Sequence, residues 1–103
     1  MTFWRVPYEW AGERCFVIAG GESVRQQERY ISALRGRIIA IKQSVALRPD
    51  ADVMFIAGKD DGRVCAASFP MHRGPYLVSR GVYPGVPTRT KILQRSVPAE
   101  RLS

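Results

Sequence analysis

The stretch CFVIAGGES, residues 15–23, decides the fold class of this sequence. A short, continuous apolar run over 14–19 is typical of a strand buried on both faces, as in a parallel sheet. The glycine pair Gly20-Gly21 ends that run and allows a sharp turn. Ser23 and Gln26 then have the spacing of a capping box, and Gly36 is a helix stop signal, so the sequence predicts a helix over 23–34.

Two further apolar runs follow at 37–41 and 52–57, with a helical turn predicted over 43–47. Short aliphatic runs separated by helical spacers indicate βαβ units with right-handed crossovers. Weaker signals predict a turn at 60–62, a short helix over 64–69, a loop over 81–87, and strands at 76–78 and 91–93. We therefore predict an α/β, Rossmann-like, three-layer fold with a mostly parallel sheet of four or five strands, in a single domain over 1–103.

Length and composition limit the class of protein. The 103 residues are 46% hydrophobic and 24% charged, which is ordinary for one small globular domain. No apolar run is long enough to cross a bilayer, and we see no secretory signal, so we expect a cytoplasmic protein of a bacterial or phage-infected cell. Trp4, Tyr8 and Trp10 are predicted to pack as a lid over one edge of the core.

The two cysteines and the single histidine give no metal-ligand spacing. We expect both thiols to be reduced, and Cys15 to be a small buried hydrophobe within its strand. His72 lies in a segment with loop chemistry. A catalytic base there is conceivable, but a surface histidine is the better prediction because no partner residue can be named.

The Gly20-Gly21 turn has the chemistry of a phosphate-binding loop. Glycines let a ligand approach the backbone closely, and the N–H groups at the start of the next helix favour an anion. The Ser23 hydroxyl suits either the phosphate or the helix cap. A tight connection without a ligand explains the same residues equally well, and the Glu22 carboxylate would repel a phosphate beside it.

Three blocks in this order and spacing resemble a known family: CFVIAGGESV at 15–24, RIIAIKQS at 37–44 and LRPDADVMF at 47–55. They are similar to the "GGGPSL" loop, the "VIAVNDA" strand and the segment before the third strand of Rossmann-like proteins. That family includes the MptE-like 6-hydroxymethylpterin diphosphokinases, phage-encoded relatives and, more distantly, bacterial CMP-sialic acid sialyltransferases. The likeness covers roughly residues 12–60, so the chain resembles the N-terminal half of the family fold.

The resemblance implies a nucleotide or other phosphorylated ligand, with group transfer from a nucleotide- or diphosphate-activated donor as the reaction. Gly20, Gly21 and Ser23 correspond to the phosphate loop, Lys42 to the end of the second strand, and Asp60 to the region after the third. Glu22 stands where relatives have Pro, and Lys42 where they have Asn. Lys42 could therefore either reach a phosphate or simply pair with Glu22.

Two side issues follow from the same segments. Asp60 and Asp61 could hold Mg²⁺ beside a diphosphate, although Asp-Asp-Gly is more often a solvated turn. A sheet that stops where the family's second half would begin leaves an exposed edge, through which we expect homo-oligomers to form.

The charge distribution supports an alternative function. The net charge is +7, and residues 71–103 carry six basic groups against one acid. Such a segment attracts polyanions, so the alternative is a non-catalytic, phage-type basic interaction module that binds nucleic acid or a partner protein. Only Tyr76 and Tyr83 interleave with these basic residues, which is fewer aromatics than single-strand binders use.

Overall fold

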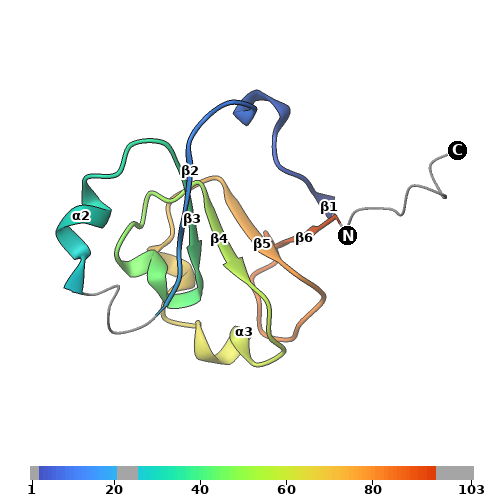
Figure 1. Cartoon of the computed structure of the whole chain (residues 1–103). Coiled ribbons are helices and arrows are strands. Elements are labelled where there is room, and N and C mark those ends of the chain that lie inside the picture. Colours follow the sequence, from blue (N-terminus) through green and yellow to red (C-terminus); the bar gives the residue numbers. More distant parts are fainter. Residues whose placement is uncertain (1–2, 21–25, 95–103) are drawn as a thin grey trace, which may run out of the picture.

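The computed structural model describes residues 3–20 and 26–94 of the chain (Figure 1). Its elements, in chain order, are β1 (Phe3–Trp4), the 3-10 helix η1 (Tyr8–Trp10), β2 (Cys15–Ile18), α2 (Glu28–Ser32), β3 (Arg37–Ile41), the 3-10 helix η2 (Lys42–Ala46), β4 (Val53–Ile56), α3 (Asp61–Val64), the 3-10 helix η3 (Phe69–Met71), β5 (Tyr76–Ser79) and β6 (Lys91–Leu93). The α/β prediction is confirmed.

All six strands are parallel and form one open sheet in the order β1-β6-β5-β4-β3-β2. From β2 to β6 each strand lies beside the next one in the chain, which is the arrangement that successive βαβ units produce. The predicted strands at 37–41, 76–78 and 91–93 are confirmed. The sheet has six strands rather than four or five because β1, too short to give a sequence signal, pairs with β6.

One side of the sheet, here called the covered face, carries Ile38, Ala40, Met54, Ile56 and Leu77, each at most 1% exposed. The helical elements after β2 pack on this side: Ile31 of α2, Val45 of η2 and Phe69 of η3 join the same cluster. The strand residues whose side chains point to this side therefore lie in a core between the sheet and the helical elements.

The opposite side, here called the open face, carries Val17, Ile39, Phe55, Tyr76 and Val78. Two tryptophans from the N-terminal segment cover part of it. Trp4 and Trp10 are both buried, meet edge to face with ring centroids 6.2 Å apart, and lie against Tyr76.

The aromatic lid is thus made by the two tryptophans. Tyr8, also predicted to take part, is 91% exposed. The 3-10 turn of η1 turns Trp10 inward and leaves Tyr8 in solvent.

The first predicted strand is not buried on both faces. β2 is an edge strand, and its open-face residues Cys15 and Val17 are exposed, Val17 by 63%. The prediction of a buried Cys15 is wrong because an apolar run alone does not say whether a strand lies at the centre or the edge of a sheet. Of the helix predicted over 23–34, the structure describes α2, and Ser23 lies outside the described residues.

Two predictions after β4 are also corrected. The expected turn at 60–62 contains the start of α3. The helix predicted over 64–69 is not formed, because α3 ends at Val64, η3 begins at Phe69, and turns lie between them. His72 is 6% exposed rather than a surface residue, and its Nε2 lies 2.7 Å from the Ala51 carbonyl oxygen. His72 directly follows η3, and its side chain packs against the loop before β4, which contains Ala51.

Candidate functional site

The carboxyl ends of β2, β3, β4 and β5 meet at one edge of the sheet, because the strands are parallel. Ligands of open α/β folds bind at this edge. Gly20 follows β2 here, Lys42 follows β3 and Gly58 follows β4. Figure 1 shows α3 just beyond the carboxyl end of β4.

Lys42 occupies an uncommon backbone conformation at this edge. Its φ is +53°, and it is the one residue other than glycine with positive φ in the described part of the chain. A lysine gains nothing from the left-handed region, and such conformations are concentrated at functional sites. The resulting turn starts η2 and places the Lys42 Nζ 3.6 Å from Oδ1 of Asp61.

Asp61 is buried, at 4% exposed, and its carboxylate is contacted by backbone N–H groups on one oxygen and by Lys42 on the other. Its Oδ2 accepts hydrogen bonds from the backbone N–H groups of Ala57, at 2.9 Å, and Gly58, at 2.8 Å. Burial by itself would raise the pKa of Asp61, but these two amides and the Lys42 ammonium outweigh it and lower that pKa. The carboxylate is therefore charged at neutral pH and fixes the loop after β4.

Ser44 supplies the least satisfied polar group at this edge. The residue is 6% exposed, and its Oγ has no hydrogen-bond partner among the described residues. A Cβ added to Gly20 would lie 4.0 Å from that oxygen, so the hydroxyl lies next to the end of β2. Buried hydroxyls are normally paired, and an unpaired one calls for an explanation.

Two more side chains complete this edge. The Tyr83 hydroxyl donates to the Ala57 carbonyl oxygen at 2.8 Å and ties the loop after β5 to the loop after β4. Burial raises the pKa of the Cys65 thiol, and the nearby Asp61 charge adds to that effect, so Cys65 is a protonated core residue rather than a nucleophile. We call Gly20, Lys42, Ser44, Asp61 and Tyr83 the carboxyl-edge cluster.

Of the predicted site residues, the structure brings Gly20 and Lys42 to this cluster. Gly21 and Ser23, and with them the pairing of Lys42 with Glu22, lie outside the described residues. Asp60 is exposed, and its neighbour Asp61 is the aspartate that reaches Lys42.

Sequence reasoning missed Ser44 and Tyr83. Ser44 had one available signal, since it lies two residues after Lys42 in the block that resembles the family's second strand. Tyr83 had none, because a loop far along the chain brings it to the cluster.

Asp60 and Asp61, predicted as ligands of Mg²⁺, are not part of a preformed acidic site in the described residues. Within 3–20 and 26–94, no three His, Cys, Asp or Glu side chains are grouped as metal ligands. Asp61 has one oxygen engaged by two amides and the other facing Lys42.

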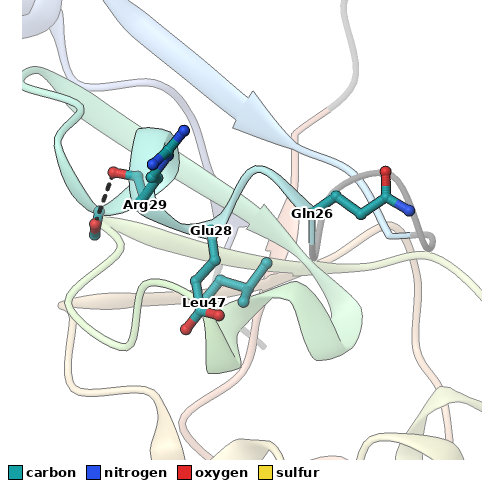
Figure 2. Close-up of a pocket in the computed structure, with 5 residues that line it drawn as sticks. Gln26, Glu28, Arg29 and Leu47 are labelled. Carbon is teal, nitrogen blue, oxygen red and sulfur yellow. Dashed lines mark hydrogen bonds between the residues drawn. The ribbon is translucent and has the colours of Figure 1, made fainter.

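A hollow of about 470 Å³ lies beside α2, lined by Gln26, Glu28, Arg29, Ser32 and Leu47 (Figure 2). It contains none of the predicted site residues. The Ser32 hydroxyl on its wall is already paired, donating to the Arg29 carbonyl oxygen at 2.9 Å. We therefore do not place the ligand site there.

The four basic residues that the structure describes after residue 70 do not share one place. Arg73 precedes β5 and Arg80 follows it, so the whole strand, roughly 13 Å long, lies between them. Arg89 reaches back to the Phe69 carbonyl oxygen, and Lys91 lies over the Tyr76 ring, 5.6 Å from its centroid. Nucleic-acid binding stays a prediction from composition.

No family model matches this sequence, and neither the curated proteins nor the solved structures contain a match. The resemblance to the MptE-like proteins therefore stays a prediction. None of the helices in the described ranges has the length and apolarity needed to span a membrane.

Proposed function

We propose that this chain binds a nucleotide or another phosphorylated ligand at the carboxyl-edge cluster. The observation that carries the proposal is the buried Ser44 hydroxyl beside Gly20, for which the described residues provide no hydrogen-bond partner. It lies two residues after a lysine held in a left-handed conformation at the same edge. A phosphate oxygen would give that hydroxyl the acceptor it lacks.

The charges of the cluster define how an anion would be held. Lys42 supplies an ammonium group, and Asp61 balances it in the absence of a ligand. An incoming phosphate competes with Oδ1 of Asp61 for Lys42, while Oδ2 of Asp61 keeps its two backbone donors. Binding therefore moves the lysine side chain without unfolding the loop after β4.

Gly20 has a steric role in this proposal. It is exposed, and a Cβ at this position would lie 4.0 Å from the Ser44 Oγ, so a side chain here would stand over that hydroxyl. A phosphate group could thus come close to the backbone at the end of β2, as the sequence predicted for the glycine pair.

The proposed reaction is group transfer from a nucleotide- or diphosphate-activated donor. The family resemblance supports it, and Ser44, Lys42 and Gly20 would hold the leaving phosphate. Asp61 is then a positioning residue, because its contacts are to the loop after β4 and to Lys42.

Thermal stabilisation by a panel of nucleoside mono-, di- and triphosphates and by pyrophosphate tests the binding site. Ser44→Ala removes the hydroxyl oxygen and no other heavy atom. Lys42→Asn removes the charge and retains a residue that tolerates positive φ. We expect each substitution to weaken binding of the best ligand about 10-fold or more.

The matched control is Lys59→Asn, which makes the same change of charge at an exposed lysine after β4. We expect it to change affinity less than about 3-fold, because an exposed cation is screened by salt. Absence of stabilisation by every compound in the panel would overturn the proposal. An equal loss in the Lys59 and Lys42 variants would also overturn it, since binding would then follow net charge alone.

A further inference from the structure

A second hollow lies between β6 and the loop that joins β5 to β6. It has a volume of about 300 Å³, at the small end of the range for ligand pockets. Ile92 of β6 forms part of its wall and faces the covered side, because it lies opposite Ser79 in the parallel register. Val86, also on the wall, packs against the core cluster of that side. The hollow therefore lies at the β6 margin of the covered face.

The loop that forms this hollow is tied to two neighbouring elements. The Tyr83 hydroxyl donates to the Ala57 carbonyl oxygen at 2.8 Å, which joins the loop to the end of β4. Gly85, whose φ is +80°, packs against Gly62 of α3. The hollow is thus held open by contacts of the folded chain, as is usual for pockets that bind small molecules.

Thr90 gives the hollow a polar group without a partner among the described residues. Its N–H donates to the Pro87 carbonyl oxygen at 3.1 Å, so the backbone of Thr90 closes the turn before β6. Its Oγ1 is buried and, within 3–20 and 26–94, has no hydrogen-bond partner. Because buried hydroxyls are normally paired, a polar ligand atom at this wall would complete the site.

The walls of the hollow carry no charged side chain within the described ranges. Both basic neighbours of Thr90 point elsewhere: the Arg89 guanidinium reaches toward the Phe69 carbonyl oxygen, and Lys91 lies over the Tyr76 ring. The apolar part of the wall is formed by Val82, Val86, Pro87 and Ile92. An uncharged flat ring fits these surroundings, whereas a phosphate, or a hexose with hydroxyls on every side, would leave polar groups unpaired.

Tyr83 connects this hollow to the carboxyl-edge cluster, since it lines the one and belongs to the other. Ser44 follows β3, and β5 lies two strands away from β3. At the ordinary spacing of strands, roughly 10 Å separates the hydroxyl of Ser44 from the start of the hollow. A ligand that occupies both places therefore needs an extended arm between its ring and its terminal phosphate, and a diphosphate provides one.

We propose that the hollow holds the base and sugar of a nucleoside diphosphate whose terminal phosphate lies at Ser44 and Lys42, an inference that rests on the proposed function. The apolar wall encloses the base, and the Thr90 hydroxyl pairs with a polar atom of the nucleoside. The substrate class is then a nucleoside diphosphate, or a donor activated by one, rather than pyrophosphate or a sugar phosphate.

Calorimetric titration of the full chain tests this assignment with pyrophosphate, the diphosphates of adenosine, guanosine, cytidine and uridine, and the corresponding monophosphates. We expect the best nucleoside diphosphate to bind about 10-fold or more tightly than pyrophosphate, because burial of the nucleoside adds to the affinity. It should exceed its own monophosphate by a similar factor, since the shorter ligand does not reach both places.

Thr90→Val separates a ligand role from a structural one, because it keeps the shape of the side chain and removes the hydroxyl. We expect about 5-fold weaker binding of the nucleoside diphosphate and a change of less than about 2-fold for pyrophosphate. The melting temperature should not fall, since a methyl group replaces a buried hydroxyl that has no described partner.

Val82→Trp places a large ring at the hollow, at a residue that is 69% exposed. It should weaken binding of the nucleoside diphosphate about 10-fold and leave pyrophosphate within about 2-fold. The matched control is Val6→Trp, at a valine that is 59% exposed between β1 and η1. It should change the affinity for either ligand by less than about 2-fold.

The outcomes separate this inference from the proposed function. Pyrophosphate that binds as tightly as every nucleoside diphosphate overturns the inference and leaves the phosphate site in place. So does an equal loss of both ligands in the Thr90 and Val82 variants. Binding of a nucleoside diphosphate that is lost in Thr90→Val but unchanged in Ser44→Ala overturns the phosphate site instead. If none of the compounds binds, both proposals are wrong.

Discussion

Neighbouring residues of one strand experience very different surroundings on the two faces of this sheet. Ile38 faces the helical elements and is 1% exposed, whereas Ile39, the next residue, faces the open side and is only partly buried. In the sequence both positions are isoleucine within one apolar run, so local pattern does not distinguish them. What distinguishes them is that the helical elements described after β2 contribute to the core cluster of the covered face, and the open face has two tryptophans.

The comparison extends to polar groups. Within 3–20 and 26–94, the buried polar residues are Ser44, Asp61, Ser68, His72 and Ser79. All five lie in, or face, the layer on the covered side, where backbone groups of loops pair with Asp61, His72 and Ser79. The open side instead holds its charges at the rim, where Arg37 pairs with Glu13 and Asp52. The covered face should therefore dominate both stability and its dependence on pH.

The largest expected effect sets the two isoleucines against each other. Ile38→Ala should lower the free energy of unfolding by about 3–4 kcal/mol, because it leaves a cavity beneath the helices. Ile39→Ala should lower it by about 1–2 kcal/mol, since the open side can relax around the smaller residue. Urea denaturation of both variants measures the difference. Equal losses would show that the open face is packed as tightly as the covered one.

The tryptophan cover comes next. Trp10→Ala should cost about 3 kcal/mol, because Trp10 packs edge to face on Trp4 and Tyr76 and carries the Arg37 guanidinium 4.8 Å from its ring centroid. Tyr8→Ala, two residues away and exposed, should change stability by less than about 0.5 kcal/mol. If both variants are equally stable, the open face does not depend on this cover.

Asp61 gives an intermediate effect. Asp61→Ala should cost about 2 kcal/mol by leaving the Ala57 and Gly58 amides without an acceptor, and Asp60→Ala should be nearly neutral. Since the folded-state pKa of Asp61 is lowered, its contribution is present above a pH of about 4 and is lost as pH falls below that value. The Asp61 variant should thus lose less stability on acidification than the unmodified chain.

His72 gives the smallest effect. Burial lowers the pKa of His72 despite its hydrogen bond to the Ala51 carbonyl oxygen, and its Nδ1 is buried without a partner among the described residues. The unfolded chain then binds the proton more readily, so stability falls as pH is lowered from 7 to 5, by at most about 1.4 kcal/mol per pH unit. His72→Gln keeps a donor and should flatten this slope. An unchanged slope would place the titrating group elsewhere.

The fold was predictable to the extent that it depends on local pattern. The runs at 37–41 and 52–57 are rich in residues that favour strands and are bounded by glycines, so they predicted the parallel sheet. β1 was not, because two residues form a strand only when β6 is already there to pair with. Nor could the run at 15–18 say that it would lie at an edge.

The candidate site was half predictable. The order of the strands places Gly20 and Lys42 together; Gly20 was named from the glycine turn that ends an apolar run, and Lys42 from the family resemblance. The preference of Lys42 for Asp61 over Asp60 depends on which aspartate starts α3 facing the sheet. Tyr83 reaches the site through a loop whose course no local pattern fixes. In this loop the Pro84 carbonyl oxygen approaches Gly62 so closely that a Cβ on Gly62 would clash with it, which only the folded chain shows.

The residues by themselves determined that strands and helical turns would alternate, because the period of apolar residues and the glycine punctuation act over a few positions. Only the tertiary structure decided which side of each strand became buried, which strand was left at the edge, and which carboxylate met the lysine. Those outcomes depend on contacts between segments far apart in the chain, and the free energy of such contacts exists only once the sheet has assembled.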